Sequence, residues 1–170
     1  MSEVHEVYLS MGSNIGNRMD YLRFGIKELK RELKLVAISS IYETEPWGYS
    51  DETPYLNLVA QFKTQLNVQE LIHFSQNLEK TAGRILKKQS LKSDYQARTL
   101  DIDVLFYDRQ IVRETNVEIP HPRLHLRNFV LIPFAEINGS FVHPVFNKTI
   151  DELIADCSDK LEIKRFERTL

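Results

Sequence analysis

The chain has 170 residues, of which 42% are apolar and 27% charged, and its formal net charge is −2 at pH 7. This length suits a single domain over residues 1–170, and the near-neutral charge gives no overall attraction to nucleic acid or anionic membrane. No apolar run of about 18 residues is present, so no segment is expected to span a membrane. The start lacks the apolar stretch of a secretory signal and Cys157 is the only cysteine, so we expect a cytoplasmic protein.

Apolar periodicity predicts two helices that alternate with strands. In chain order we predict a strand opening "VYLSMGSNIG" (7–16), a helix over 18–35, strands over 35–44 and 55–66, a helix over 68–81, and a strand in "RTLDIDVLFYD" (98–108). Asn17 or Ser13 can cap the first helix, and Asn67 the second, with Gly83 as its stop. This order is typical of a ferredoxin-like α+β sandwich, an antiparallel sheet with helices packed on one face.

C-terminal additions follow this unit. They are a short hairpin near "RQIV" and "NVEIP", a helix after "HPRLHLRNF", and a final strand in "LEIKRFE".

Two carboxylates interrupt the strand at 98–108. Asp101 and Asp103 are two residues apart, so they project from the same face with Cα atoms roughly 6.5–7 Å apart. The opposite face is predicted to be apolar and to carry Leu100, Ile102, Val104 and Phe106. Because like charges this close repel, cations must offset them, either Arg and Lys side chains or divalent metal ions.

Two interpretations of the aspartates remain open from this motif alone. Magnesium is usually held by one or two carboxylates with substrate phosphates and water, and a pair of ions roughly 3.5–4 Å apart assists phosphoryl displacement. Alternatively, both aspartates lie on a solvated sheet face and pair with lysines.

Cationic residues flank the aspartate strand on both sides. The segment 84–98 holds five Arg or Lys against one acid, and "IPHPRLHLRNF" supplies His121, Arg123, His125 and Arg127. Guanidinium groups bind phosphate oxygens through paired hydrogen bonds, and lysines bind them as point charges. The motifs of zincins, α/β-hydrolases and P-loop NTPases are absent from the sequence.

Five segments in order make the chain recognisable: "YLSMGSNIGNR", "YETEPWG", "PYLN", "RTLDIDVLFYD" and "IPHPRLHLRNFVL". Together they resemble the 6-hydroxymethyl-7,8-dihydropterin pyrophosphokinase family of folate synthesis, from about residue 5 to 137. The resemblance implies the ferredoxin-like fold. It also implies transfer of the pyrophosphoryl group of ATP to the pterin hydroxymethyl group, with release of AMP and use of two Mg2+ ions.

The resemblance further implies roles for individual residues. Asp101 and Asp103 are expected to bind metal and to be catalytic together with Arg98 and Arg84. The pterin is expected to contact Thr44, Trp47, Tyr55, Asn57 and Phe129. ATP is expected to contact Gln76, Glu79, Arg98, Val104, His121 and Arg127. No partner beyond these small molecules is implied, and we expect a monomer that binds neither nucleic acid nor membrane.

The segment before the aspartate strand departs from the family pattern. Gln96 and Ala97 replace the usual Gly-Pro, Tyr95 stands where an aromatic residue, often Trp, is usual, and Leu86 replaces a common second Arg. These changes affect the expected phosphate contacts but not the metal site.

Two other functions are kept as alternatives. A ferredoxin-like module can bind single-stranded RNA by stacking bases on sheet aromatics, although exposed aspartates and the absence of a basic surplus disfavour it. The second alternative is a pterin-binding relative without catalytic activity. An assay for release of AMP from ATP in the presence of Mg2+ and the pterin separates the pyrophosphokinase from both alternatives.

Overall fold

The computed structural model describes residues 3–48, 53–83, 98–166 and 170. Its strands are β1 (His5–Ser13), β2 (Lys34–Ile38), β3 (Tyr42–Thr44), β4 (Tyr55–Thr64), β5 (Asp101–Tyr107), β6 (Val112–Glu114), β7 (Val117–Ile119) and β8 (Ile163–Arg165). Among the described residues, six strands form one sheet in the order β5-β1-β4-β3-β8, and β2 also pairs with β4. All pairings in it are antiparallel.

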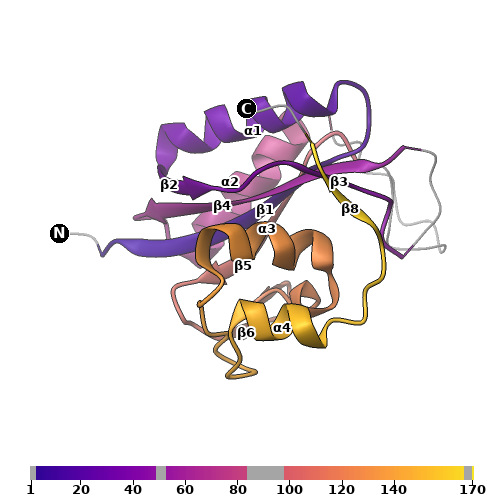
Figure 1. Ribbon diagram of the computed structural model, residues 1–170. Coiled ribbons are helices and arrows are strands. Elements are labelled where there is room, and N and C mark those ends of the chain that lie inside the picture. Colours follow the sequence, from indigo (N-terminus) through magenta and orange to yellow (C-terminus); the bar gives the residue numbers. More distant parts are fainter. Residues whose placement is uncertain (1–2, 49–52, 84–97, 167–169) are drawn as a thin grey trace.

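Helices cover both faces of this sheet (Figure 1). Helices α1 (Arg18–Glu32) and α2 (Val68–Thr81) lie on one face, and α3 (Asn128–Asn138) and α4 (Ile150–Asp156) lie on the other. The ferredoxin-like prediction is therefore confirmed, with the difference that the C-terminal additions occupy the face that we expected to be free of helices. A β6–β7 hairpin and a short 3-10 helix, Leu124–Leu126, complete the described structure.

Two apolar cores result from the alternation of side chains along the central strands. Leu9 of β1 packs into the core under α1 and α2, whereas its neighbour Tyr8 packs into the core under α3. In that second core the Tyr8 ring stacks on Phe134 with centroids 4.6 Å apart. Burial on both faces leaves most residues of β1 and β4 inaccessible, and this centre of the sheet carries site residues at one end.

The helix boundaries follow the capping residues that the sequence predicts. The Asn17 side chain accepts a hydrogen bond from the Asp20 N–H, and Ser13 instead ends β1. Asn67 forms a capping box with Glu70 at the start of α2. Gly83 follows the end of α2 with a φ of +91°, which a glycine adopts without strain.

The predicted strand over 35–44 is broken in the structure. The Ser39 hydroxyl accepts a hydrogen bond from the Val59 N–H, and the Ser39 N–H donates to the Val59 carbonyl. These bonds replace regular pairing at the boundary between β2 and β3.

The predicted position of Phe106 is wrong. Leu100, Ile102 and Val104 pack toward α1 and α2 as expected, but the register between β1 and β5 shifts after Val104. This β-bulge turns Phe106 to the opposite face, where it packs with Leu105 in the second core.

Helix α4 was not predicted, although its sequence carries a start signal. Thr149 and Glu152 form a capping box at its first turn. Within the described part of the chain, no helix is long and apolar enough to cross a membrane.

Candidate active site

Two adjoining cavities meet at the aspartate end of β5. They share Arg98, Asp101, Asp103 and His121 as lining residues. The first has a volume of about 270 Å³ and is also lined by Thr44, Trp47, Tyr55, Asn57, Arg127 and Phe129. The second has a volume of about 210 Å³ and is also lined by Gln76, Glu79 and Val104. The structure thus brings together every described residue to which the resemblance assigns a role, whereas His125 lines neither cavity, and Arg84 and the altered segment through Ala97 lie outside the described residues.

The two aspartates lie on the shared wall of these cavities. Asp101 and Asp103 pair with Gly12 and Ser10 of β1, and their side chains are 25% and 33% exposed. Arg98 forms a hydrogen-bonded ion pair with Asp101. On the other side, the Arg127 Nη1 atom lies 3.8 Å from the Asp103 carboxylate. Fixed guanidinium groups therefore offset the repulsion between the carboxylates.

Glu79 of α2 is the buried acid of this site, with 3% of its surface exposed. Its carboxylate accepts a hydrogen bond of 2.9 Å from the Ile102 N–H, which lies between the two aspartates. Burial alone would lower the pKa of the Arg98 guanidinium, but the nearby carboxylates, first that of Asp101, raise it above its ordinary value. Arg98 therefore keeps its positive charge between the two cavities.

His121 is held neutral. Burial and the positive charge of Arg127 lower its pKa to about 4, although Asp101 opposes the shift. The Arg123 N–H donates a hydrogen bond of 3.1 Å to the His121 Nδ1 atom, so the proton of the neutral ring is on Nε2. The Nε2 atom faces the Asp103 carboxylate at 3.7 Å, which makes it a hydrogen-bond donor directed into the site.

A buried amide lies at the back of the first cavity. The Asn57 Nδ2 group donates a hydrogen bond of 2.8 Å to the Thr44 hydroxyl, and both residues are buried. A Cβ atom on Gly12 would lie 2.9 Å from the Asn57 Oδ1 atom, closer than Cβ contacts normally come. Sequence reasoning missed this role of Gly12, and a glycine inside a predicted strand was the available signal.

Aromatic rings form the other wall of the first cavity. The Arg127 guanidinium carbon lies 4.9 Å from the Trp47 ring centroid and 5.6 Å from that of Phe129. These distances are within cation–π range. Arg127 thereby joins the aromatic wall to Asp103, and a flat aromatic ligand fits the chemistry of this cavity.

The donor set suits a hard divalent cation that shares its ligands with a substrate. The described residues contain no group of three or more His, Cys, Asp or Glu that could hold a metal ion by themselves. Mg2+ commonly takes only one or two carboxylates and completes its shell with phosphate oxygens and water. Two partly exposed carboxylates beside cationic side chains fit that requirement.

Comparisons with known proteins agree on one family. Residues 8–139 match the model of the family described as 7,8-dihydro-6-hydroxymethylpterin-pyrophosphokinase (HPPK). The chain is 36% identical over 146 residues to 2-amino-4-hydroxy-6-hydroxymethyldihydropteridine pyrophosphokinase of Aquifex aeolicus, covering 86% of this chain and 88% of the relative. It is 39% identical over 132 residues to the Bacillus subtilis protein of the same name, covering 76% of each.

A solved structure of similar fold is the wild-type HPPK-DHPS of Plasmodium falciparum. It aligns with a TM-score of 0.74 and 15% identity, covering 92% of this chain. This chain spans only 45% of that longer protein. At this level of identity the likeness concerns the fold alone.

Proposed function

The chain belongs to the 7,8-dihydro-6-hydroxymethylpterin-pyrophosphokinase family, and from that premise we propose which residues carry out the reaction and how. The enzyme transfers pyrophosphate from ATP to hydroxymethyldihydropterin in folate synthesis. One observation supports the assignment of residues, namely that a polar and aromatic cavity and a second cavity share Arg98, Asp101, Asp103 and His121 as a common wall. A reaction that joins two substrates requires such a junction.

We assign the first cavity to the pterin. The amide of Asn57, fixed by Thr44, presents hydrogen-bonding atoms to the polar edge of the bicyclic ring. Phe129, Tyr55 and Trp47 contact its faces, and the stacking of flat rings favours this arrangement. The hydroxymethyl group then points toward Asp101 on the shared wall.

We assign the second cavity to ATP. Gln76, Glu79 and Val104 line the part that receives the nucleoside, with Gln76 and Glu79 three residues apart on one face of α2. Arg98 and neutral His121 donate hydrogen bonds to phosphate oxygens at the shared wall, and Arg127 donates to them from the first cavity, beside Asp103. Arg84 is proposed as a further phosphate ligand and lies outside the described residues.

We propose that the reaction depends on Mg2+, with Asp101 and Asp103 as the protein ligands of two ions. Bound Mg2+ would neutralise phosphate charge and lower the pKa of the pterin hydroxyl. Arg98 and Glu79 hold the aspartate strand in place, Arg98 through its ion pair and Glu79 through the Ile102 N–H.

The transfer is a displacement at phosphorus. The pterin hydroxyl oxygen forms a bond to the β-phosphorus of ATP, the bond from that phosphorus to the α–β bridging oxygen breaks, and AMP leaves with the bond's electron pair. The hydroxyl proton passes to solvent. Arg98 and Arg127 stabilise the negative charge that develops on AMP, because fixed cations need no rearrangement at the moment of reaction.

The assignment is tested by isosteric changes at the aspartates. Asp101→Asn and Asp103→Asn should each slow AMP release from ATP, Mg2+ and the pterin by at least about 100-fold, because each removes a charged oxygen ligand. Asp156→Asn is the matched control, since Asp156 pairs with Lys148 on the surface of α4. Both aspartate variants should keep the thermal unfolding temperature of the parent. Near-parental AMP release by either variant would overturn the metal assignment.

A single-domain monomer acting in the cytoplasm stays a prediction from the sequence. Sedimentation of the purified chain would test the oligomeric state.

A further inference from the structure

Hydrogen bonds link the turn between β1 and α1 to both proposed substrate cavities. The turn contributes two residues, Asn14 at the end of β1 and Arg18 at the start of α1. Asn14 is 1% exposed, and 21% of the Arg18 side-chain surface is exposed. Neither residue lines either cavity.

Arg18 joins the two backbone segments that enter the first cavity. Its Nη1 atom lies 2.8 Å from the Glu43 carboxylate and donates a hydrogen bond of 2.7 Å to the Pro54 carbonyl. Glu43 directly precedes Thr44, and Pro54 directly precedes Tyr55. One guanidinium group therefore fixes the positions just before two residues of the proposed pterin site.

Asn14 joins the first cavity to the shared wall. Its Oδ1 atom accepts a hydrogen bond of 2.7 Å from the Arg98 N–H, and its own N–H donates one of 3.0 Å to the Arg98 carbonyl. Its Nδ2 group also donates a bond of 3.4 Å to the Thr53 carbonyl, next to Pro54. The N–H and the carbonyl of Arg98 are therefore both hydrogen-bonded to Asn14. These bonds fix the backbone position from which the Arg98 side chain reaches Asp101.

We propose that Arg18 and Asn14 are positioning residues, Arg18 for pterin recognition and Asn14 for the alignment of Arg98. This inference rests on the proposed assignment of the two cavities. Neither residue contacts the reacting atoms, so their effects reach the reaction through Thr44, Tyr55 and Arg98. Displacing a substrate-contacting group by even about 1 Å can reduce a rate by about 100-fold.

The test separates the two effects by steady-state kinetics. Arg18→Met should raise the KM for the pterin by about 10-fold and leave the KM for ATP within about twofold. The reason is that the substitution loosens only the segments at Glu43 and Pro54, which lead into the first cavity. Asn14→Ala should lower kcat by about 10–100-fold, because the Arg98 N–H loses its side-chain acceptor while only the backbone bond to the Arg98 carbonyl remains. Arg18→Lys should restore part of the pterin affinity, because its ammonium group can pair with Glu43.

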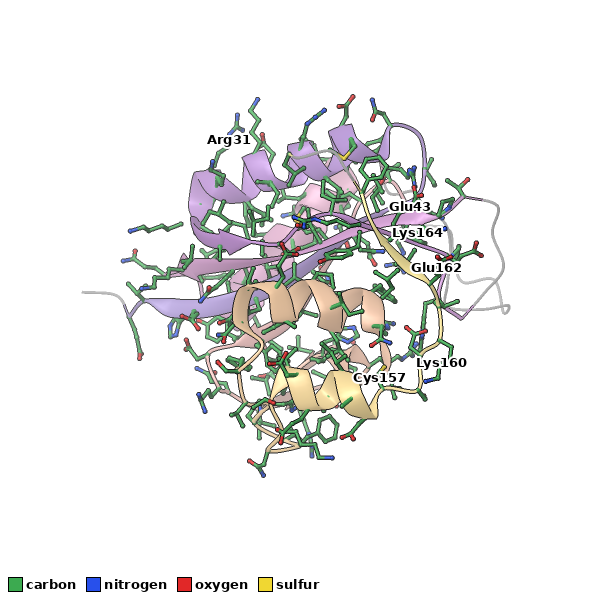
Figure 2. The ribbon with its side chains drawn as sticks, in the orientation of Figure 1. Arg31, Glu43, Cys157, Lys160, Glu162 and Lys164 are labelled. Carbon is green, nitrogen blue, oxygen red and sulfur yellow. The ribbon has the colours of Figure 1, made fainter. Side chains whose placement is uncertain are left out.

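The matched control is Arg31→Met on the same helix. Arg31 pairs with Glu28 at 2.6 Å, its side chain is 65% exposed, and Figure 2 shows it at the other end of α1 from Glu43. This variant should match the parent in both KM values and in kcat.

Three outcomes are distinguished. If Arg18→Met changes only the unfolding temperature, or raises both KM values equally, the residue has a structural role alone and the inference fails. If the Asn57→Ala variant binds the pterin more weakly while the Arg18→Met variant binds it as tightly as the parent, the cavity assignment is supported and the positioning role of Arg18 is refuted. If Asn57→Ala leaves pterin affinity unchanged, the cavity assignment itself is wrong.

Discussion

Glu79 provides a sharp test of how the aspartate strand is held. Its carboxylate is 3% exposed and accepts the Ile102 N–H at 2.9 Å, so the substitution Glu79→Ala would leave a buried N–H without this acceptor. An unsatisfied buried donor costs about 1–3 kcal/mol, and a hydrogen bond to a charged group is at the upper end of that range. We therefore expect the free energy of unfolding to fall by about 2–3 kcal/mol. For a chain of this size the corresponding fall in unfolding temperature is roughly 4–12 °C.

Glu79→Gln separates the charge from the hydrogen bond. The amide oxygen can still accept the Ile102 N–H, so the loss of stability should be only about 1 kcal/mol. Both variants remove one negative charge near Arg98, whereas only the alanine variant frees the backbone between the aspartates. AMP release should therefore fall by about 10–100-fold for Glu79→Ala and clearly less for Glu79→Gln.

Urea unfolding and AMP release should be measured on the same preparations. Glu162→Gln is the control, since Glu162 forms an exposed pair with Lys164, and such pairs contribute little to stability (Figure 2). If Glu79→Ala unfolds at the parental urea concentration, the carboxylate does not support the strand and the argument for its positioning role is refuted.

Three further predictions follow from single residues. Gly12→Ala should raise the KM for the pterin by about 10-fold with little change for ATP, because the new Cβ atom forces Asn57 to move; unchanged pterin kinetics would contradict this. Trp47 is the only tryptophan, so the pterin should change the protein's tryptophan fluorescence in a saturable way, and an unresponsive signal would place the ligand elsewhere. Burial, with a smaller effect of His125, lowers the pKa of His143 to about 4 in the folded protein. In the unfolded chain this imidazole has its ordinary pKa of about 6.5, so below that pH the unfolded state binds more protons than the folded state. The contribution of His143 to stability should be complete above about pH 6.5 and fall by up to about 3 kcal/mol toward pH 4, and His143→Asn should remove this part of the pH dependence in urea unfolding at several pH values.

The sequence predicted most of the fold because local signals and tertiary packing agree there. Asn67 and Glu70 mark the start of α2 both in the sequence and in the structure. The bulge that reverses Phe106 has no such local signal, because it arises from how β5 pairs with β1. Register between distant strands depends on the partner strand, which a single strand's alternation does not encode.

The site was recognisable through motif order rather than through any one motif. Asp101 and Asp103 are recognisable in the sequence because they interrupt an apolar strand. The structure places them between cationic side chains, as expected. The contributions of Gly12, Asn14 and Arg18 depend on close approaches across 25 to 84 residues of chain. Such contacts leave no periodic pattern, so only the folded arrangement reveals them.

The pairing of β8 with β3 has a consequence for how the chain meets other copies of itself. Residues Ile163–Arg165 lie beyond the segment 8–139 that matches the family model, yet they pair with Tyr42–Thr44 along the outer side of β3. Without them, that side would expose free N–H and C=O groups, which readily recruit a strand from a neighbouring molecule. The sheet therefore ends on this side in β8, a three-residue strand that carries Lys164 and Arg165, and short charged edge strands recruit a neighbouring chain less readily than long apolar ones.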